Sequence, residues 1–133
     1  MSTDRVKAFL EFKALYQKAH QAGMAALEAC TPRPMVVEQH KNMADDRSPV
    51  VEQYYVPQGV CGFAWVKVRP ATSAFARWAK GQKLASTDGY ADGLVFWVRE
   101  GGQSMELKEA YAWAFAEVLR GAGLDAYAQS RID

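Results

Sequence analysis

The strictest constraint on the fold lies in the second half of the chain, where residues 60–69 alternate between small aliphatic and larger side chains. A proline follows this run, and a second alternating run covers residues 94–99, after a turn signal at residues 86–89. Alternation with a period of two is typical of a β-strand whose two faces have different neighbours. In both runs the even-numbered residues are apolar or glycine, whereas the odd-numbered ones include Trp65 and Trp97.

Helical patterns separate and follow these strands. Thr72 or Ser73 is placed to cap a short helix, and a glycine pair and a serine precede a helical pattern over residues 105–120. A last alternating run covers residues 126–132. Residues 60–133 therefore predict a β-α-β-α-β core, a three-stranded sheet with its helices packed on one face.

The first half of the chain predicts a long helix followed by a β-arm. Apolar residues recur at helical spacing over residues 3–30, and two prolines then end the helix. Residues 34–57 hold two β-branched runs that share Val-Val-Glu-Gln, at 36–39 and 50–53. We expect an antiparallel arm or two edge strands, with a polar tip at residues 43–47, that extend the sheet of the core.

Composition limits the classes of protein that fit. A length of 133 residues and 50% hydrophobic residues predict one α+β domain, residues 1–133, rather than a disordered chain or a rod. No apolar run is long enough to span a membrane, and no secretory signal is recognisable, so we expect a cytoplasmic protein. The net charge of +1 gives little general attraction to DNA. His20 and His40 are far apart in sequence, so neither a metal site nor a cofactor is predicted.

Five segments carry a resemblance to a known group of proteins: 34–37, 59–70, 73–78, 108–116 and 123–133. They resemble small proteins encoded by phages and prophages, and the resemblance covers the chain from Pro34 onward. It implies an accessory protein that acts on host or phage machinery in the bacterial cytoplasm. The group has no assigned activity, so it supplies no catalytic residue.

The odd-numbered face of the predicted sheet is the candidate binding site. Each of the three strands contributes an aromatic residue near its middle and an arginine toward its end. The candidate binding residues are Trp65, Lys67, Arg69, Trp97, Arg99, Tyr127 and Arg131. Aromatic rings with neighbouring guanidinium groups could stack bases and hold phosphates.

Two other arrangements would bury this face. The apolar stripe of the N-terminal helix needs a surface to pack against, and the aromatic face with Phe63 and Trp97 offers one. We expect this covered arrangement, because large exposed aromatic patches are rare on monomers. A homodimer built across the same face is the other arrangement.

The sequence therefore favours a non-catalytic accessory protein that binds a macromolecular partner, a host or phage protein, through the β-arm or a sheet edge. The alternative is binding of nucleotides or single-stranded nucleic acid on the aromatic face. A small enzyme ranks third, since no nucleophile, base and oxyanion site come together in the sequence.

Overall fold

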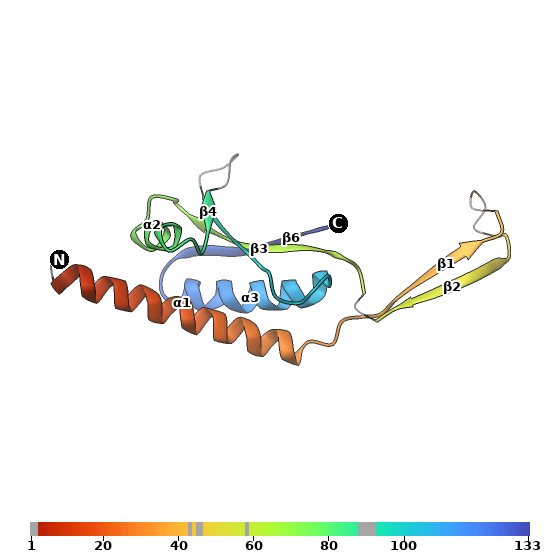
Figure 1. The fold of residues 1–133 in the computed structure, drawn as a ribbon, viewed down its shortest axis with the longest axis horizontal. Coiled ribbons are helices and arrows are strands. Elements are labelled where there is room, and N and C mark those ends of the chain that lie inside the picture. The colour runs from red at the N-terminus through yellow and green to blue at the C-terminus, as the bar shows by residue number, and fades with distance from the viewer. Residues whose placement is uncertain (1–2, 43, 45–46, 58, 88–92) are drawn as a thin grey trace.

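The computed structural model describes residues 3–42, 44, 47–57, 59–87 and 93–133. Figure 1 shows a sheet with helices beneath it and a two-stranded ribbon that projects from one end. The predicted α+β architecture is confirmed, including the order of the long helix, the arm and the β-α-β-α-β core. None of the described helices is long and apolar enough to cross a membrane.

The central sheet is antiparallel, with the strand order β4-β5-β3-β6. Its strands are β3 (Gly62–Arg69), β4 (Ser86–Thr87), β5 (Leu94–Trp97) and β6 (Asp125–Ile132). The sequence did not predict β4, because a strand of two residues is too short to show alternation. The turn predicted at residues 86–89 begins in β4, and its second half lies outside the described residues.

Two of the three helices described lie on one side of this sheet, and the third, short one lies at its end (Figure 1). The three helices are α1 (Thr3–Ala29), α2 (Ala74–Gly81) and α3 (Met105–Gly121). The side chain of Ser73 accepts a hydrogen bond from the backbone N–H of Ala76, and that of Ser104 accepts one from Leu107. These bonds satisfy donors that a helix leaves unpaired at its first turn, so both serines are N-caps.

The hydrophobic core lies between the even-numbered face of the sheet and the helices. Small side chains on both sides, such as Ala64 on β3 and Ala112 on α3, are fully buried and let the two layers approach closely. Phe75 from α2 and Phe115 from α3 fill the remaining space. The other strand and helix residues of this core include Val66, Val68, Leu94, Phe96, Val98, Tyr111, Ala116 and Leu119.

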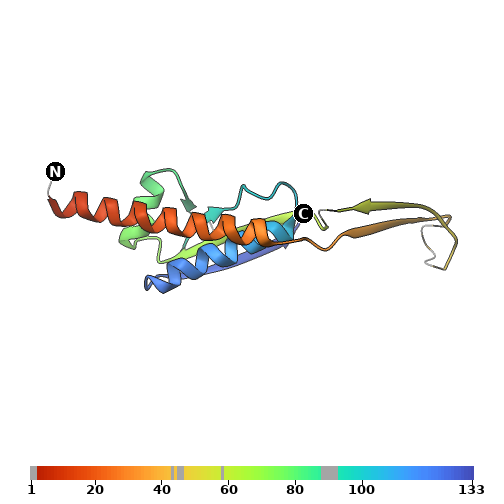
Figure 2. The same ribbon diagram turned by 90° about the horizontal axis from the view of Figure 1, so that it is seen from below.

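Helix α1 packs beside α3, on the same side of the sheet, so the expectation that it covers the aromatic face is wrong. Viewed from below, it lies between α2 and α3 (Figure 2). The ring of Tyr16 is 5.8 Å from that of Phe115 and 6.3 Å from that of Phe96, and Phe12 is 5.7 Å from Phe75. Because α3 packs mainly on β3 and β6, the aromatic residues of β5 and α2 need a second cover, and α1 provides it.

The arm is a separate two-stranded sheet of β1 (Met35–His40) and β2 (Val50–Val56), with a bulge between Gln39 and His40. It does not extend the central sheet, which corrects the prediction. The chain leaves the arm to enter β3, and β3 already has β5 on one edge and β6 on the other. The predicted polar tip, residues 43–47, lies partly outside the described residues.

Candidate functional site

The odd-numbered face of the sheet, called the open face because no described helix covers it, has two tryptophans at its centre, although Lys67 and Val95 beside them are buried. No helix of the described chain lies over this face (Figure 1). Trp65 and Trp97 are directly opposite each other on β3 and β5, with ring centroids 5.1 Å apart and planes inclined at 48°. Trp65 donates a hydrogen bond from Nε1 to Oε1 of Gln129 at 2.8 Å, whereas Trp97 is 48% exposed. Trp97 was expected to be buried, and that expectation is wrong.

Two arginines border these tryptophans along the face. The guanidinium carbon of Arg131 lies 5.5 Å from the ring centroid of Phe63, and that of Arg69 lies 5.7 Å from the ring of Tyr127. Both distances are within the range of a cation–π interaction. Phe63 is half-buried, and Nζ of Lys108 from α3 also lies 5.4 Å from its ring centroid. The open face is thus aromatic in the middle and cationic toward its ends.

Two of the predicted binding residues do not lie exposed on this face. Lys67 is only 5% exposed, and a Cβ atom added at Gly93 would approach its side chain to 2.6 Å, so its stem is closely packed. Arg99 follows the end of β5 and lines a cavity between the sheet edge and the helices. The structure therefore brings five of the seven predicted residues together on the open face: Trp65, Arg69, Trp97, Tyr127 and Arg131.

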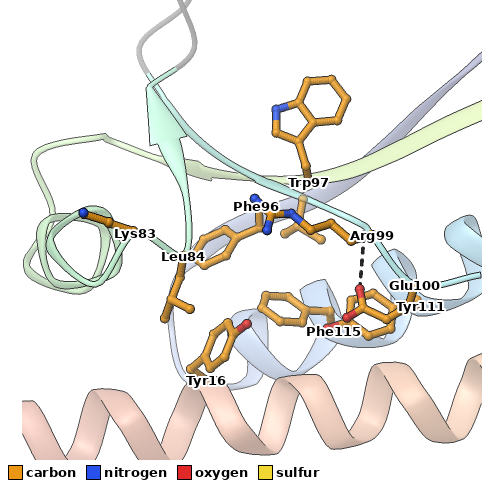
Figure 3. Close-up of a pocket in the computed structure, with 10 residues that line it drawn as sticks. Tyr16, Lys83, Leu84, Phe96, Trp97, Arg99, Glu100, Tyr111 and Phe115 are labelled. Carbon is orange, nitrogen blue, oxygen red and sulfur yellow. Dashed lines mark hydrogen bonds between the residues drawn. The ribbon is translucent and has the colours of Figure 1, made fainter.

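The cavity beside Arg99 has a volume of about 230 Å³. Phe96 and Phe115 form its apolar wall, while Tyr16 and Tyr111 enter from α1 and α3 (Figure 3). Figure 3 also shows that Trp97 points away from these tyrosines, to the other side of the sheet. The cavity and the open face therefore meet at Trp97 on β5, whose ring points to the open face.

A polar contact between α1 and α3 lies next to this cavity. The hydroxyl of Tyr111 is hydrogen-bonded to Nδ1 of His20 at 2.6 Å. Burial, and secondly the carboxylate of Glu100, raise the pKa of Tyr111 above its ordinary value of about 10. Burial also raises the pKa of Tyr16, with Glu100 again acting in the same direction. Both hydroxyls therefore stay protonated at neutral pH and can donate hydrogen bonds.

The β-arm is a second candidate surface. Val36 and Tyr55 are directly opposite each other on β1 and β2, and both are exposed, Tyr55 to 68%. Two residues further along β1, the pair Glu38 and Gln53 is joined by a side-chain hydrogen bond of 3.2 Å. Over residues 34–57 the sequence has four acidic residues and two lysines or arginines. The arm is thus an acidic ribbon with an apolar cross-strand pair on its surface.

The base of the arm is fixed to the body. Arg33 donates from its backbone N–H and from Nε to the two carboxylate oxygens of Glu106, at 3.2 and 3.3 Å. Gly59, between β2 and β3, has a φ of +76°, and a Cβ there would come within 2.4 Å of the carbonyl oxygen of Arg33. Only glycine fits this close approach. On the returning side the backbone N–H of Met105 donates to the carbonyl of Val60 at 3.0 Å, so both ends of the arm are held at the first turn of α3.

Sequence reasoning missed the cavity and the contact between His20 and Tyr111. Tyr16 and His20 are four residues apart, which places them on one side of a helix, and this spacing was the available signal. Their partner on α3 could not be inferred, because it depends on how the two helices pack. Among the described residues, no group of three or more His, Cys, Asp or Glu side chains is placed to hold a metal ion.

The chain matches no protein-family model, no curated protein and no solved structure. The open face and the β-arm are therefore the two surfaces from which function can be inferred.

Proposed function

We propose that the chain is a non-catalytic binding module that engages a protein partner through its β-arm, by strand addition. The observation that carries the proposal is the projecting ribbon itself, which shows the apolar pair Val36 and Tyr55 to solvent. An isolated two-stranded hairpin is marginally stable in water. A third strand from a partner would supply main-chain hydrogen bonds and cover apolar side chains.

The charge of the arm supports a protein rather than a nucleic acid as the partner. Arms that enter a DNA groove use Arg and Lys to contact phosphates and bases. This arm has twice as many acidic residues as lysines and arginines, so a phosphate backbone would repel it. The complementary partner is an extended segment with apolar residues flanked by basic ones. An accessory role on host or phage machinery in the cytoplasm belongs to the same proposal.

Site-specific photo-crosslinking in cells of the protein's natural source tests this proposal. A benzophenone amino acid replaces Tyr55, and a matched control replaces Lys13, which is exposed on α1. We expect a discrete adduct with one protein from position 55 and none from position 13. Hydrogen exchange on that purified complex should then show protection of residues 35–56 relative to the free chain. Equal exchange in both states would exclude the arm as the binding surface.

A second candidate function is binding of nucleotides or single-stranded nucleic acid on the open face. The specific observation in its favour is the exposed ring of Trp97, with Arg131 and Arg69 on the same face. Stacking of one base on an aromatic ring contributes about 1 to 3 kcal/mol. The inclined planes of the two tryptophans and the burial of Lys67 limit this site to a small ligand.

Tryptophan fluorescence distinguishes this candidate from the first. Titration with mixed short single strands and free nucleotides should give saturable quenching that weakens as salt rises. The Trp97→Ala variant should lose this response, while Trp113→Ala, on the outer side of α3, should retain it. No quenching of the wild-type protein would exclude nucleic-acid binding on the open face.

A further inference from the structure

The outer edge of the central sheet is formed by β6, an eight-residue strand that, within the described chain, pairs with β3 alone. The backbone N–H of Asp133 donates to the carbonyl of Cys61 at 3.1 Å, so the odd-numbered residues of β6 bond toward β3. The even-numbered residues therefore direct their N–H and C=O groups outward. Accordingly, the Arg120 side chain donates to the carbonyl of Ala126 at 2.9 Å. The outward positions are Ala126, Ala128, Ser130 and Ile132.

Helix α3 presents one face to the same edge. Glu109 accepts a hydrogen bond from the hydroxyl of Ser130 at 3.0 Å, and Arg120 contacts Ala126. Trp113 lies one helical turn after Glu109, about 6 Å further along the axis, which places it level with the middle of β6. Its side chain is 59% exposed. The edge therefore has an acidic group at one end of its α3 flank, a tryptophan near the middle and a basic group at the other end.

We propose that this edge binds a second copy of the chain, β6 against β6 in antiparallel orientation, with Ala128 opposite its own symmetry mate. The two-fold operation reverses the strand, so it places Asp125 of one copy opposite Arg131 of the other. It also places Ile132, which is 67% exposed, opposite Leu124 of the other copy. Opposite charges on facing strands stabilise the pair, whereas like charges destabilise it.

Other registers of the same edge are less complementary. Moving the centre by one residue, to Gln129, would place Asp125 opposite Asp133 of the second copy. The register centred on Ala128 also brings the two Trp113 rings together near the axis and Glu109 toward Arg120 of the second copy. Ala126 is only 1% exposed and Arg120 bonds its outward carbonyl, so the exposed Arg120 side chain has to turn aside for Ala126 to pair with Ser130 of the second copy. The result is one continuous eight-stranded sheet with α1 and α3 of both copies on one side.

Sedimentation velocity of the full chain tests the dimer, at loading concentrations from about 1 to about 300 µM. We expect the mass to rise from 14.8 kDa toward twice that value as the concentration increases. A constant mass of one chain over this range would overturn the proposal. This result would leave the partner of the β-arm untouched, since the proposed edge does not include β1 or β2.

Charge exchange tests the register. Asp125→Arg alone places two arginines opposite each other, and Arg131→Asp alone places two aspartates there, so each should weaken the dimer about tenfold or more. The double variant restores opposite charges and should recover the wild-type dissociation constant. Arg77→Asp, on the exposed side of α2, is the matched control and should leave the dissociation constant unchanged.

Trp113→Glu tests the helix side of the same edge. It should weaken the dimer without changing the circular dichroism of the monomer. Single variants that dimerise as the wild type does, or a double variant without recovery, would overturn the proposed pairing.

Discussion

The two faces of the central sheet differ in how they are covered. The even-numbered face has small aliphatic side chains such as Ala64 and Val66, and three helices pack against it. The odd-numbered face has larger rings, Trp65 and Trp97 among them, and no helix of the described chain covers it. Apolar content alone would favour burial of the second face. The comparison shows that close packing depends on how near two layers can approach, and small side chains permit the nearest approach.

The largest difference between the two faces is expected in the response to truncation of an aromatic ring. Phe115→Ala on the covered side should lower the free energy of unfolding by about 3 to 5 kcal/mol, because it leaves a cavity in the core. The matched change Trp97→Ala on the open face should cost less than about 1 kcal/mol. Urea unfolding measures both values. An equal loss for the two variants would show that Trp97 belongs to the core.

Adding volume to a side chain of α3 should also cost more stability on its buried side than on its exposed side. We expect this difference in the free energy of unfolding to be smaller than the one between Phe115→Ala and Trp97→Ala. Ala112→Leu forces three extra carbon atoms between α3 and the sheet, so it should cost about 1 to 3 kcal/mol. Glu117→Leu places the same side chain on the exposed side of α3 and serves as the control. Thermal unfolding compares the two variants. If Ala112→Leu were as stable as the control, close approach of the layers would not explain where the helices pack.

Tyr111→Phe tests the polar contact on the covered side. Loss of the hydrogen bond to His20 should cost about 0.5 to 1.5 kcal/mol at neutral pH. Since burial raises the pKa of Tyr111 in the folded state, the unfolded chain loses this proton first as pH increases. The contribution is therefore fully present below about pH 10 and decreases above it.

Denaturant unfolding between neutral pH and about pH 11 measures this effect. The wild-type free energy of unfolding should fall above the ordinary tyrosine pKa, and Tyr111→Phe should make that fall shallower. Part of the fall in the free energy of unfolding should remain in this variant, because burial raises the pKa of Tyr16 as well. Tyr55→Phe, on the exposed arm, is the matched control. A fall as steep as in the wild type would show that Tyr111 ionises without opposing the fold.

The smallest effect is expected on the open face itself. Gln129→Ala removes the hydrogen bond to Nε1 of Trp65, but water can replace it on an exposed surface, so the cost should stay within about 0.5 kcal/mol. Urea unfolding again provides the value. A loss above about 1.5 kcal/mol would mean that this bond is shielded from water and that the face is less open than its geometry indicates.

Much of this arrangement could be predicted from the sequence, because it depends on local patterns. Alternation over residues 60–69 assigned each side chain of β3 to the correct face, and two serines marked the helix starts. The position of α1 could not be predicted, since its stripe fits either face and the choice depends on the uncovered rings of Phe75 and Phe96. The burial of Lys67 could not be predicted either, because it depends on how closely the backbone at Gly93 approaches the Lys67 side chain.

The attachment of the arm has a mechanical consequence. β2 is seven residues long, so the far end of the arm lies roughly 20 Å from its base. A flexible linker would not transmit a force applied at that distance to the body of the protein. A two-stranded ribbon held at both of its ends transmits such a force to its base. Any load on the tip produces a torque at the base, where Arg33 and Glu106 form the ion pair with the first turn of α3. Load on the arm would therefore be passed to the first turn of α3, through the bonds from Arg33 to Glu106 on one side and from Met105 to the carbonyl of Val60 on the other.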